Sequence, residues 1–132
     1  MARKKKILFV CVENSCRSQM AEGFARALGG DRIESHSAGS RPSGEVNPRA
    51  SAIMKERGID LAGHRSKGLE ELPRITWDVL VTMGCGDSCP FVTADAVVDW
   101  GLPDPKEMDD AGFRKVRDEI ERKVRELWEG LG

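Results

Sequence analysis

The first part of the chain changes from a short apolar run to a helical pattern of apolar positions. Residues 7–10 are all apolar, and so short a run predicts a buried strand rather than a helix. After Ser18, apolar residues recur at intervals of three and four as far as Leu28, and glycines follow at positions 29 and 30. This spacing predicts an amphipathic helix that ends at the glycine pair.

The same patterns predict that strands and helices alternate along the rest of the chain. Asn47 followed by Pro48 is typical of a helix start, and Asp109 or Asp110 is expected to cap the last helix. Such alternation indicates an α/β fold with parallel strands and right-handed crossovers. The further predicted elements are strands at residues 32–38, 78–83 and 97–100, helices at residues 48–57 and 113–131, a helical turn at residues 69–72 and a loop at residues 41–45.

Length and charge limit the classes to which the protein can belong. Its 132 residues suit one domain, residues 1–132, with a core large enough to fold without disulfides or metals. Lys and Arg number 21 against 22 Asp and Glu, so a nucleic-acid partner has no electrostatic support. No apolar run approaches the roughly 20 residues of a membrane span, and no signal-type apolar segment follows the basic residues near the start. We therefore expect a cytoplasmic protein that binds neither nucleic acid nor a membrane.

The segment at residues 11–18 joins the first strand to the first helix and carries the candidate chemistry. Such a loop leaves backbone N–H groups unpaired beside the positive end of the helix dipole, which suits a tetrahedral oxyanion. The same field and Arg17 favour the thiolate form of Cys11, and the guanidinium can hold two oxygens of an anion. Ser18 is expected to cap the helix and donate to the thiolate, and Asn14 to adopt a left-handed backbone. The predicted oxyanion-binding residues are Val12, Glu13, Asn14, Ser15, Cys16 and Arg17.

A buried structural cysteine beside a surface arginine is the alternative interpretation of Cys11. It leaves the coincidence of strand, loop, Cys, Arg, Ser and helix unexplained. The sequence CVENSCRS at residues 11–18 resembles the phosphate loop of the low-molecular-weight protein tyrosine phosphatase family. The continuation QMAEG is closer to the arsenate reductase branch of that family, which couples to thioredoxin or a small thiol. The resemblance implies a three-layer sandwich whose four-stranded parallel sheet, of order 2-1-3-4, has helices on both faces.

Chemical groups follow three of the predicted strands. Cys11 follows the first strand, Cys85 the third and Asp104 the fourth. Ligands of open parallel sheets bind beyond the carboxyl ends of the strands, so these residues should share one edge. Asp104 and Pro105 resemble the family's general-acid motif, in which the Asp protonates a departing oxygen. The family's phosphatases usually have an aromatic residue next, whereas this chain has Lys106 and no tyrosine.

The cysteines at positions 85 and 89 allow three interpretations. Together with Cys11 and Cys16 they could form a zinc site, although Arg17 beside the cluster argues against one. A structural disulfide would be unusual in a cytoplasmic chain. Redox chemistry agrees best with the pattern, and Cys16 is expected to pack behind the loop.

The resemblance implies a role for each of the later cysteines. In these arsenate reductases, a cysteine at the position of Cys85 attacks the arsenylated nucleophile, and a later cysteine resolves the disulfide. Many thioredoxin-coupled members have a longer spacing between the two than Cys85 and Cys89 have. Cβ atoms four positions apart on a helix are about 5–6 Å apart, whereas a disulfide needs roughly 3.5–4.5 Å. Both Cys89 and an external thiol therefore stay open as the resolving group.

One further departure concerns a cation site. Some arsenate reductases of this family bind potassium through an Asn of the loop, a Glu of the first helix, a Ser and an Asp. Asn14, Glu22 and Ser37 match three of these positions, but the fourth is Lys67, whose charge would repel a second cation. We predict no bound potassium and a contact between Lys67 and Glu22; the alternative is an exposed surface lysine.

These observations lead to one hypothesis and two alternatives. The hypothesis is that the protein reduces arsenate to arsenite through Cys11, Arg17, Ser18, Cys85, Cys89 and Asp104, with no metal or organic cofactor. Phosphate or sulfate would compete for the loop, and thioredoxin or a low-molecular-weight thiol would supply the electrons. The first alternative is a tyrosine or small-molecule phosphatase that uses only Cys11, Arg17 and Asp104. The second is a thiol-based redox or arsenic sensor with little turnover.

Overall fold

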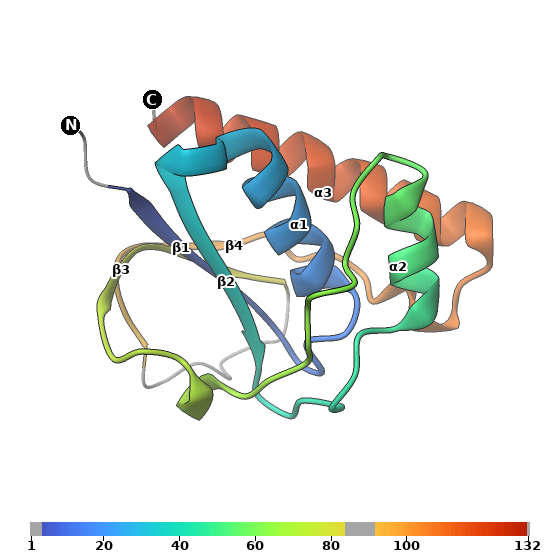
Figure 1. Ribbon diagram of the computed structural model, residues 1–132, viewed down its shortest axis with the longest axis horizontal. Coiled ribbons are helices and arrows are strands. Elements are labelled where there is room, and N and C mark those ends of the chain that lie inside the picture. Colours follow the sequence, from blue (N-terminus) through green and yellow to red (C-terminus); the bar gives the residue numbers. More distant parts are fainter. Residues whose placement is uncertain (1–3, 84–91, 132) are drawn as a thin grey trace.

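The computed structural model of the protein describes residues 4–83 and 92–131. Its elements follow the predicted alternation of strands and helices (Figure 1). Cys85 and Cys89 lie outside the described residues, so their roles stay predictions. The elements are β1 Lys5–Cys11, α1 Arg17–Gly29, η1 Gly30–Arg32, β2 Ile33–Gly39, α2 Pro48–Lys55, η2 Leu69–Glu71, β3 Thr76–Thr82, β4 Thr93–Asp99, η3 Pro105–Glu107 and α3 Asp110–Leu131.

The four strands form one parallel sheet in the order β2-β1-β3-β4, which confirms the predicted order. Cys11 is opposite Gly39 in the ladder between β1 and β2, so the ends of these two strands share the carboxyl edge of the sheet. The fourth strand begins at Thr93, earlier than the predicted residue 97. Because β4 is an edge strand with mostly exposed side chains, its first half lacks the apolar run that indicates a buried strand.

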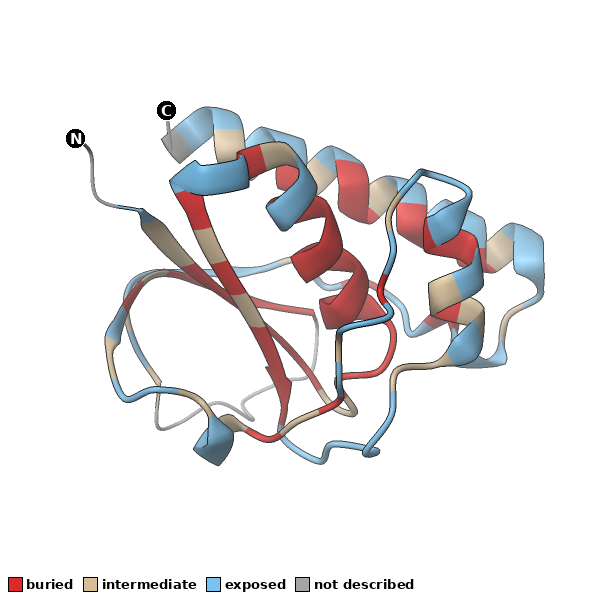
Figure 2. Ribbon diagram, in the orientation of Figure 1, coloured by how far each residue is buried: buried red, intermediate tan, exposed pale blue. Residues whose placement is uncertain are grey.

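The three α-helices pack together against one face of the sheet (Figure 1). Alternate residues of β1, namely Ile7, Phe9 and Cys11, join α1, α2 and α3 in a single core on this face. Figure 2 shows buried positions concentrated on α1 and on the central strands. Within the described residues, no helix combines the length and the apolar character that crossing a bilayer requires.

The opposite face of the sheet has a smaller core. Leu8, Val10, Trp77 and Leu80 pack there with Ala38, and the segment around the single turn η2 covers them. Within the described residues, the helical layer on this face is therefore thinner than the predicted three-layer sandwich suggests. The predicted short turn is confirmed at η2.

Side chains at the helix starts confirm two predicted caps and correct a third. The Asn47 side chain accepts the N–H of Arg49 at 2.9 Å, and Asp109 Oδ1 accepts the N–H of Gly112 at 2.9 Å. The prediction that Ser18 caps α1 is wrong, because α1 begins at Arg17 and Cys16 occupies the cap position without a side-chain hydrogen bond. The Ser18 hydroxyl lies inside the first turn and takes part in the contacts described next.

Candidate active site

The loop between β1 and α1 comprises residues 11–17 and is called the nucleophile loop below. Its backbone carbonyl groups form hydrogen bonds with the surrounding structure. Each carbonyl of residues 12–15 accepts a hydrogen bond from a group that lies outside residues 11–17. In the described part of the chain, by contrast, the N–H groups of residues 13–16 have no acceptor, so they are available to an anion. The donors are Arg41 N to Val12 O, Ser43 N and Ser66 Oγ to Glu13 O, Gln19 Nε2 to Asn14 O, and Asn47 N to Ser15 O, at 2.7–3.1 Å.

Gly39 at the end of β2 lets the nucleophile loop pack directly on the sheet. A Cβ atom at this position would lie 2.4 Å from the Val12 carbonyl oxygen and 3.0 Å from the Asn14 nitrogen. Both neighbours are backbone atoms of the loop, so no side chain could rotate away to make room. The curvature of the loop therefore depends on a glycine that is distant in sequence.

The nucleophile candidate is paired with a hydroxyl group whose orientation is determined by its neighbours. Cys11 is buried, and its Sγ lies 2.9 Å from Ser18 Oγ. Asn14 Nδ2 donates to the same Oγ at 2.7 Å, so the hydroxyl proton of Ser18 is free to point at the sulfur. Asn14 has φ 53, which confirms the predicted left-handed backbone. The predicted contact between Ser18 and the thiol is also confirmed.

A second layer of contacts determines which way the Asn14 amide faces. Asn14 Oδ1 accepts from Gln19 Nε2 and from the Lys67 N–H, each at 2.9 Å, which leaves its Nδ2 to serve Ser18. Gln19 is completely buried, and its Oε1 lies 2.9 Å from His64 Nδ1. Burial lowers the pKa of His64, which favours a neutral ring with its proton on Nδ1. Sequence reasoning gave Gln19 no role; its only signal was a polar residue at a buried helix position.

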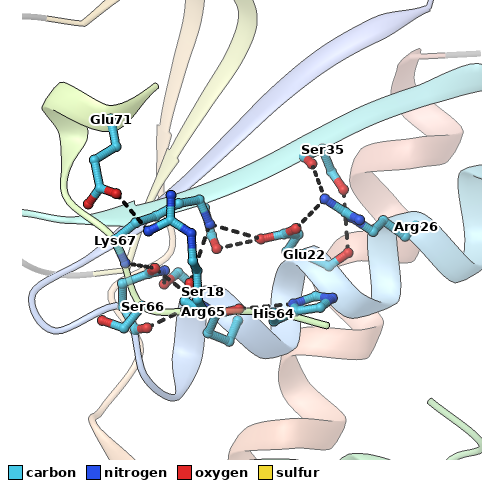
Figure 3. Close-up of polar contacts among 12 residues, drawn as sticks. Ser18, Glu22, Arg26, Ser35, His64, Arg65, Ser66, Lys67 and Glu71 are labelled. Atoms are coloured by element: carbon cyan, nitrogen blue, oxygen red, sulfur yellow. Dashed lines mark hydrogen bonds and ion pairs between the residues drawn. The ribbon is translucent and has the colours of Figure 1, made fainter. Parts of the chain in front are cut away.

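The predicted contact between Lys67 and Glu22 is confirmed (Figure 3). Lys67 Nζ lies 4.0 Å from Glu22 Oε1, and the lysine side chain is only 14% exposed. Burial lowers the pKa of Lys67. The carboxylate of Glu22 also accepts from Ser37 Oγ at 2.5 Å and pairs with Arg26 at 2.6 Å.

The side chains that match the family's potassium ligands are poorly suited to bind a potassium ion. Asn14 Oδ1 already accepts two hydrogen bonds, and the ammonium of Lys67 places a positive charge beside Glu22. Among the described residues, no three His, Cys, Asp or Glu side chains gather as metal ligands. Because the zinc alternative needs Cys85 and Cys89, it lies outside the described residues.

Arg17 connects the nucleophile loop with the ends of the neighbouring strands. Its Nη1 donates to the carbonyl oxygens of Met83 at 2.7 Å and Leu102 at 2.8 Å. These contacts hold the guanidinium in place. Within residues 4–83 and 92–131, Nε has no hydrogen-bond acceptor and Nη2 has only the long contact with Asp104, so this edge can face an anion. Nη2 lies 3.9 Å from Asp104 Oδ2, so Asp104 lies at the same edge as the nucleophile loop. This agrees with the predicted shared edge for Cys11 and Asp104, whereas Cys85, the third residue of that prediction, lies outside the described residues.

Asp104 is positioned by its own backbone turn. Its Oδ1 accepts the Lys106 N–H at 3.0 Å and caps η3, while its other oxygen is the one near Arg17. The Asp104 side chain is 44% exposed, so a proton can reach it from solvent.

Cys16 lies at the opposite end of the nucleophile loop from Cys11. It is buried, which confirms that it packs behind the loop. Burial raises the pKa of Cys16 to about 11, so this residue stays a thiol at neutral pH.

A pocket of about 440 Å³ lies beside the nucleophile loop. Most of the residues that line it are polar, and an ion pair between Glu13 Oε2 and Lys106 Nζ, 2.7 Å apart, forms part of its wall. Glu13 and Ser15 of the nucleophile loop line the pocket, so it adjoins the loop.

The chain is similar in sequence and in structure to known proteins. The sequence model of the low molecular weight phosphotyrosine protein phosphatase family matches residues 6–132. The chain is 43% identical over 126 residues to the glutaredoxin arsenate reductase of Synechocystis sp., covering 93% of this chain and 95% of the relative. A solved arsenate reductase in the phosphate binding state is 41% identical with a TM-score of 0.89, covering 97% of this chain and 99% of that one. The thioredoxin-dependent arsenate reductase of Corynebacterium glutamicum is 32% identical with a TM-score of 0.81, covering 98% of this chain and 62% of that one.

Proposed function

The chain belongs to the low molecular weight phosphotyrosine protein phosphatase family, and from this premise we propose that it reduces arsenate to arsenite. The observation that carries the proposal is a buried Cys11 paired with Ser18 in a loop whose carbonyls at residues 12–15 accept hydrogen bonds from groups outside the loop. Relatives named as arsenate reductases, about 40% identical over nearly the whole chain, support the substrate. Tetrahedral arsenate and phosphate have the same shape and charge, so phosphate is expected to compete.

In the first step the Cys11 thiolate attacks the pentavalent arsenic. A sulfur–arsenic bond forms and one arsenic–oxygen bond breaks. Asp104 gives a proton to the departing oxygen, which leaves as water. The loop N–H groups and the Nε and Nη2 edge of Arg17 stabilise the charge on the remaining oxygens. Ser18 donates to the sulfur and so favours the reactive thiolate.

In the second step Cys85 attacks the Cys11 sulfur. A disulfide forms, the sulfur–arsenic bond breaks and its electron pair stays on arsenic, which leaves as trivalent arsenite. Met83, two residues before Cys85 in the sequence, accepts a hydrogen bond from Arg17, and this supports the required proximity.

The enzyme must then be reduced by two electrons. Either Cys89 attacks Cys85, which releases Cys11 and leaves a Cys85–Cys89 disulfide for an external thiol reductant to reduce, or an external thiol attacks the first disulfide directly. The relatives include a glutaredoxin arsenate reductase and a thioredoxin-dependent arsenate reductase, so we propose a thiol-based reductant. The need for reduced thiols fits the cytoplasmic location predicted from the sequence.

The test is arsenite release by the full chain with either a thioredoxin system or glutathione and glutaredoxin. We expect turnover by the parent, none by Cys11→Ser, and a loss of at least about a hundredfold for Cys85→Ser, because each removes a step of the electron transfer. Cys89→Ser decides the resolving group: it is inactive if Cys89 resolves the disulfide and active if an external thiol does.

The competing function is phosphate ester hydrolysis by Cys11, Arg17 and Asp104 alone. The family match supports it, because the same loop would bind a phosphoryl group. It predicts that Cys85→Ser hydrolyses para-nitrophenyl phosphate like the parent and that the parent releases no arsenite. Equal arsenite release by the parent, Cys85→Ser and Cys89→Ser would contradict the proposed reduction.

A further inference from the structure

An ion pair connects the nucleophile loop to the segment that carries Asp104. Lys106 Nζ lies 2.7 Å from Glu13 Oε2, although the two residues are 93 positions apart in the chain. The hydrogen bond that Lys106 donates to Glu13 raises the pKa of Lys106, so the lysine is fully charged at neutral pH. We call these two side chains the mouth pair.

Both ends of the mouth pair are attached to backbone that is held independently. The Glu13 carbonyl accepts from Ser43 N at 3.0 Å and from Ser66 Oγ at 2.7 Å. The Lys106 N–H donates to Asp104 Oδ1 at 3.0 Å. The mouth pair therefore spans a gap between two positioned segments instead of following a single flexible one.

The mouth pair is also part of the wall of the 440 Å³ pocket beside the nucleophile loop. Ser15 of the loop and Asn47 at the start of α2 line the same pocket. Because the nucleophile loop contributes Glu13 and Ser15 to the wall, a substrate larger than the bound oxyanion would extend from the loop toward this pocket.

Folding stability does not explain the mouth pair. The Lys106 and Glu13 side chains are 46% and 34% exposed, and exposed ion pairs contribute little to stability because water screens them. We therefore look for the role of the mouth pair in its position at the pocket and not in its contribution to stability.

We infer that the mouth pair determines substrate class: it admits a free tetrahedral oxyanion and disfavours a phosphoryl or arsenyl group that carries an aryl substituent. The inference rests on the proposed function, which places the anion in the nucleophile loop and Asp104 beside the departing oxygen. An aryl substituent at that oxygen must pass between the loop and the Asp104 segment, and the mouth pair spans this path. Free arsenate has no such substituent and leaves the pair closed.

The same pair keeps the entrance electrically neutral. Glu13 alone would repel an anion and Lys106 alone would attract one, whereas the closed pair does little of either. Removing one partner would consequently change the affinity for every anion, and only removal of both isolates the effect on size.

The experiment measures binding, so it does not depend on arsenate turnover. Phenylphosphonate and inorganic phosphate are titrated into the reduced full chain, and the ratio of their dissociation constants is compared between the parent and the double variant Glu13→Gln/Lys106→Met. We expect phenylphosphonate to bind about fivefold more tightly relative to phosphate in the double variant, a change of about 1 kcal/mol, the upper end for opening an exposed ion pair.

Two further variants serve as controls. Lys106→Arg can keep the pair and should keep the parent ratio. Arg122→Met removes an exposed ion pair with Glu126 on α3, and it should leave the ratio unchanged.

An unchanged ratio in the double variant overturns the inference, as does an equal change in Arg122→Met. If the parent binds phosphate but releases no arsenite, the proposed function fails while the ratio still tests the mouth pair. If neither anion binds the parent, both proposals are overturned.

Discussion

Two regions of the molecule use similar polar side chains in opposite surroundings. Behind the nucleophile loop, Asn14, Gln19 and Glu22 are buried and each makes several short contacts. On the outside of α2 and α3, arginines and glutamates form many ion pairs in contact with solvent. The comparison shows that the number of ion pairs is a poor measure of importance. In the buried region each group depends on a specific partner, whereas on the surface water can replace any partner.

The largest difference between the regions is expected for an added methyl group. Gly39→Ala would place Cβ against the Val12 carbonyl oxygen, so the nucleophile loop must move. We expect a loss of about 1–3 kcal/mol in the free energy of unfolding, and a fall of at least about a hundredfold in arsenite release, because displaced catalytic groups lose rate steeply. Urea unfolding and turnover measure the two effects.

The matched control is Gly130→Ala in α3. No atom lies within 4 Å of a Cβ at this position, and alanine favours a helix. Unfolding free energy should be equal to or above that of the parent, with unchanged turnover. Similar behaviour of the two variants would show that the loop does not depend on Gly39.

The next largest effect separates the side chain of Asn14 from its backbone conformation. Asn14→Gly keeps the left-handed backbone but removes the amide that orients Ser18. We expect a loss of about 1–3 kcal/mol in unfolding free energy, because the Lys67 N–H loses its acceptor, and a fall of about tenfold in alkylation of Cys11 by iodoacetamide. Asn14→Ala should lose about 1 kcal/mol more, since alanine disfavours positive φ. Equal stability of the two variants would contradict the role of the backbone.

A smaller effect is expected for the reactivity of the Cys16 thiol, which lies in the buried region. Because burial raises the pKa of Cys16 to about 11, this thiol should resist iodoacetamide at neutral pH and react as the pH approaches 11. Peptide mapping by mass spectrometry in the folded protein distinguishes Cys16 from the other cysteines. Ready alkylation of Cys16 at pH 7 would contradict its predicted state.

The smallest effect on stability is expected for Glu56 at the surface, where ion pairs rather than burial shift the pKa of the carboxyl group. Hydrogen bonds from Arg114 and Arg117 lower the pKa of Glu56 from 4.5 to about 2. A lowered pKa means that the stabilisation is present above pH 4.5 and is lost as the pH falls toward 2. Glu56→Gln should be slightly less stable than the parent at pH 7, and this difference should vanish near pH 2. A difference that is independent of pH would contradict the ion pairs as its cause.

Local patterns predicted most of the fold because burial leaves a periodic signal. Residues 7–10 are all buried, as expected of a short apolar run, and most of the apolar residues that predicted the helix ending at Gly29 lie in the core. The signal failed where burial is one-sided or absent. β4 is exposed along almost all of its length at the edge of the sheet, and its first residues, TADA, contain no apolar run, so its start was predicted too late. The cap of α1 was misassigned because the Ser18 hydroxyl serves Cys11 and Asn14 instead.

The sequence by itself determined the order of the elements, the chemical groups and the loop that brings Cys11, Arg17 and Ser18 together, since these follow from neighbours in the chain. Only the tertiary structure decided the partners that come from far away: Gly39 beneath the loop, Gln19 against His64, and Lys106 across from Glu13. A sequence pattern records which side of an element is buried. It does not record which distant atom lies within hydrogen-bond distance, because that depends on how the strands, helices and loops pack together in three dimensions.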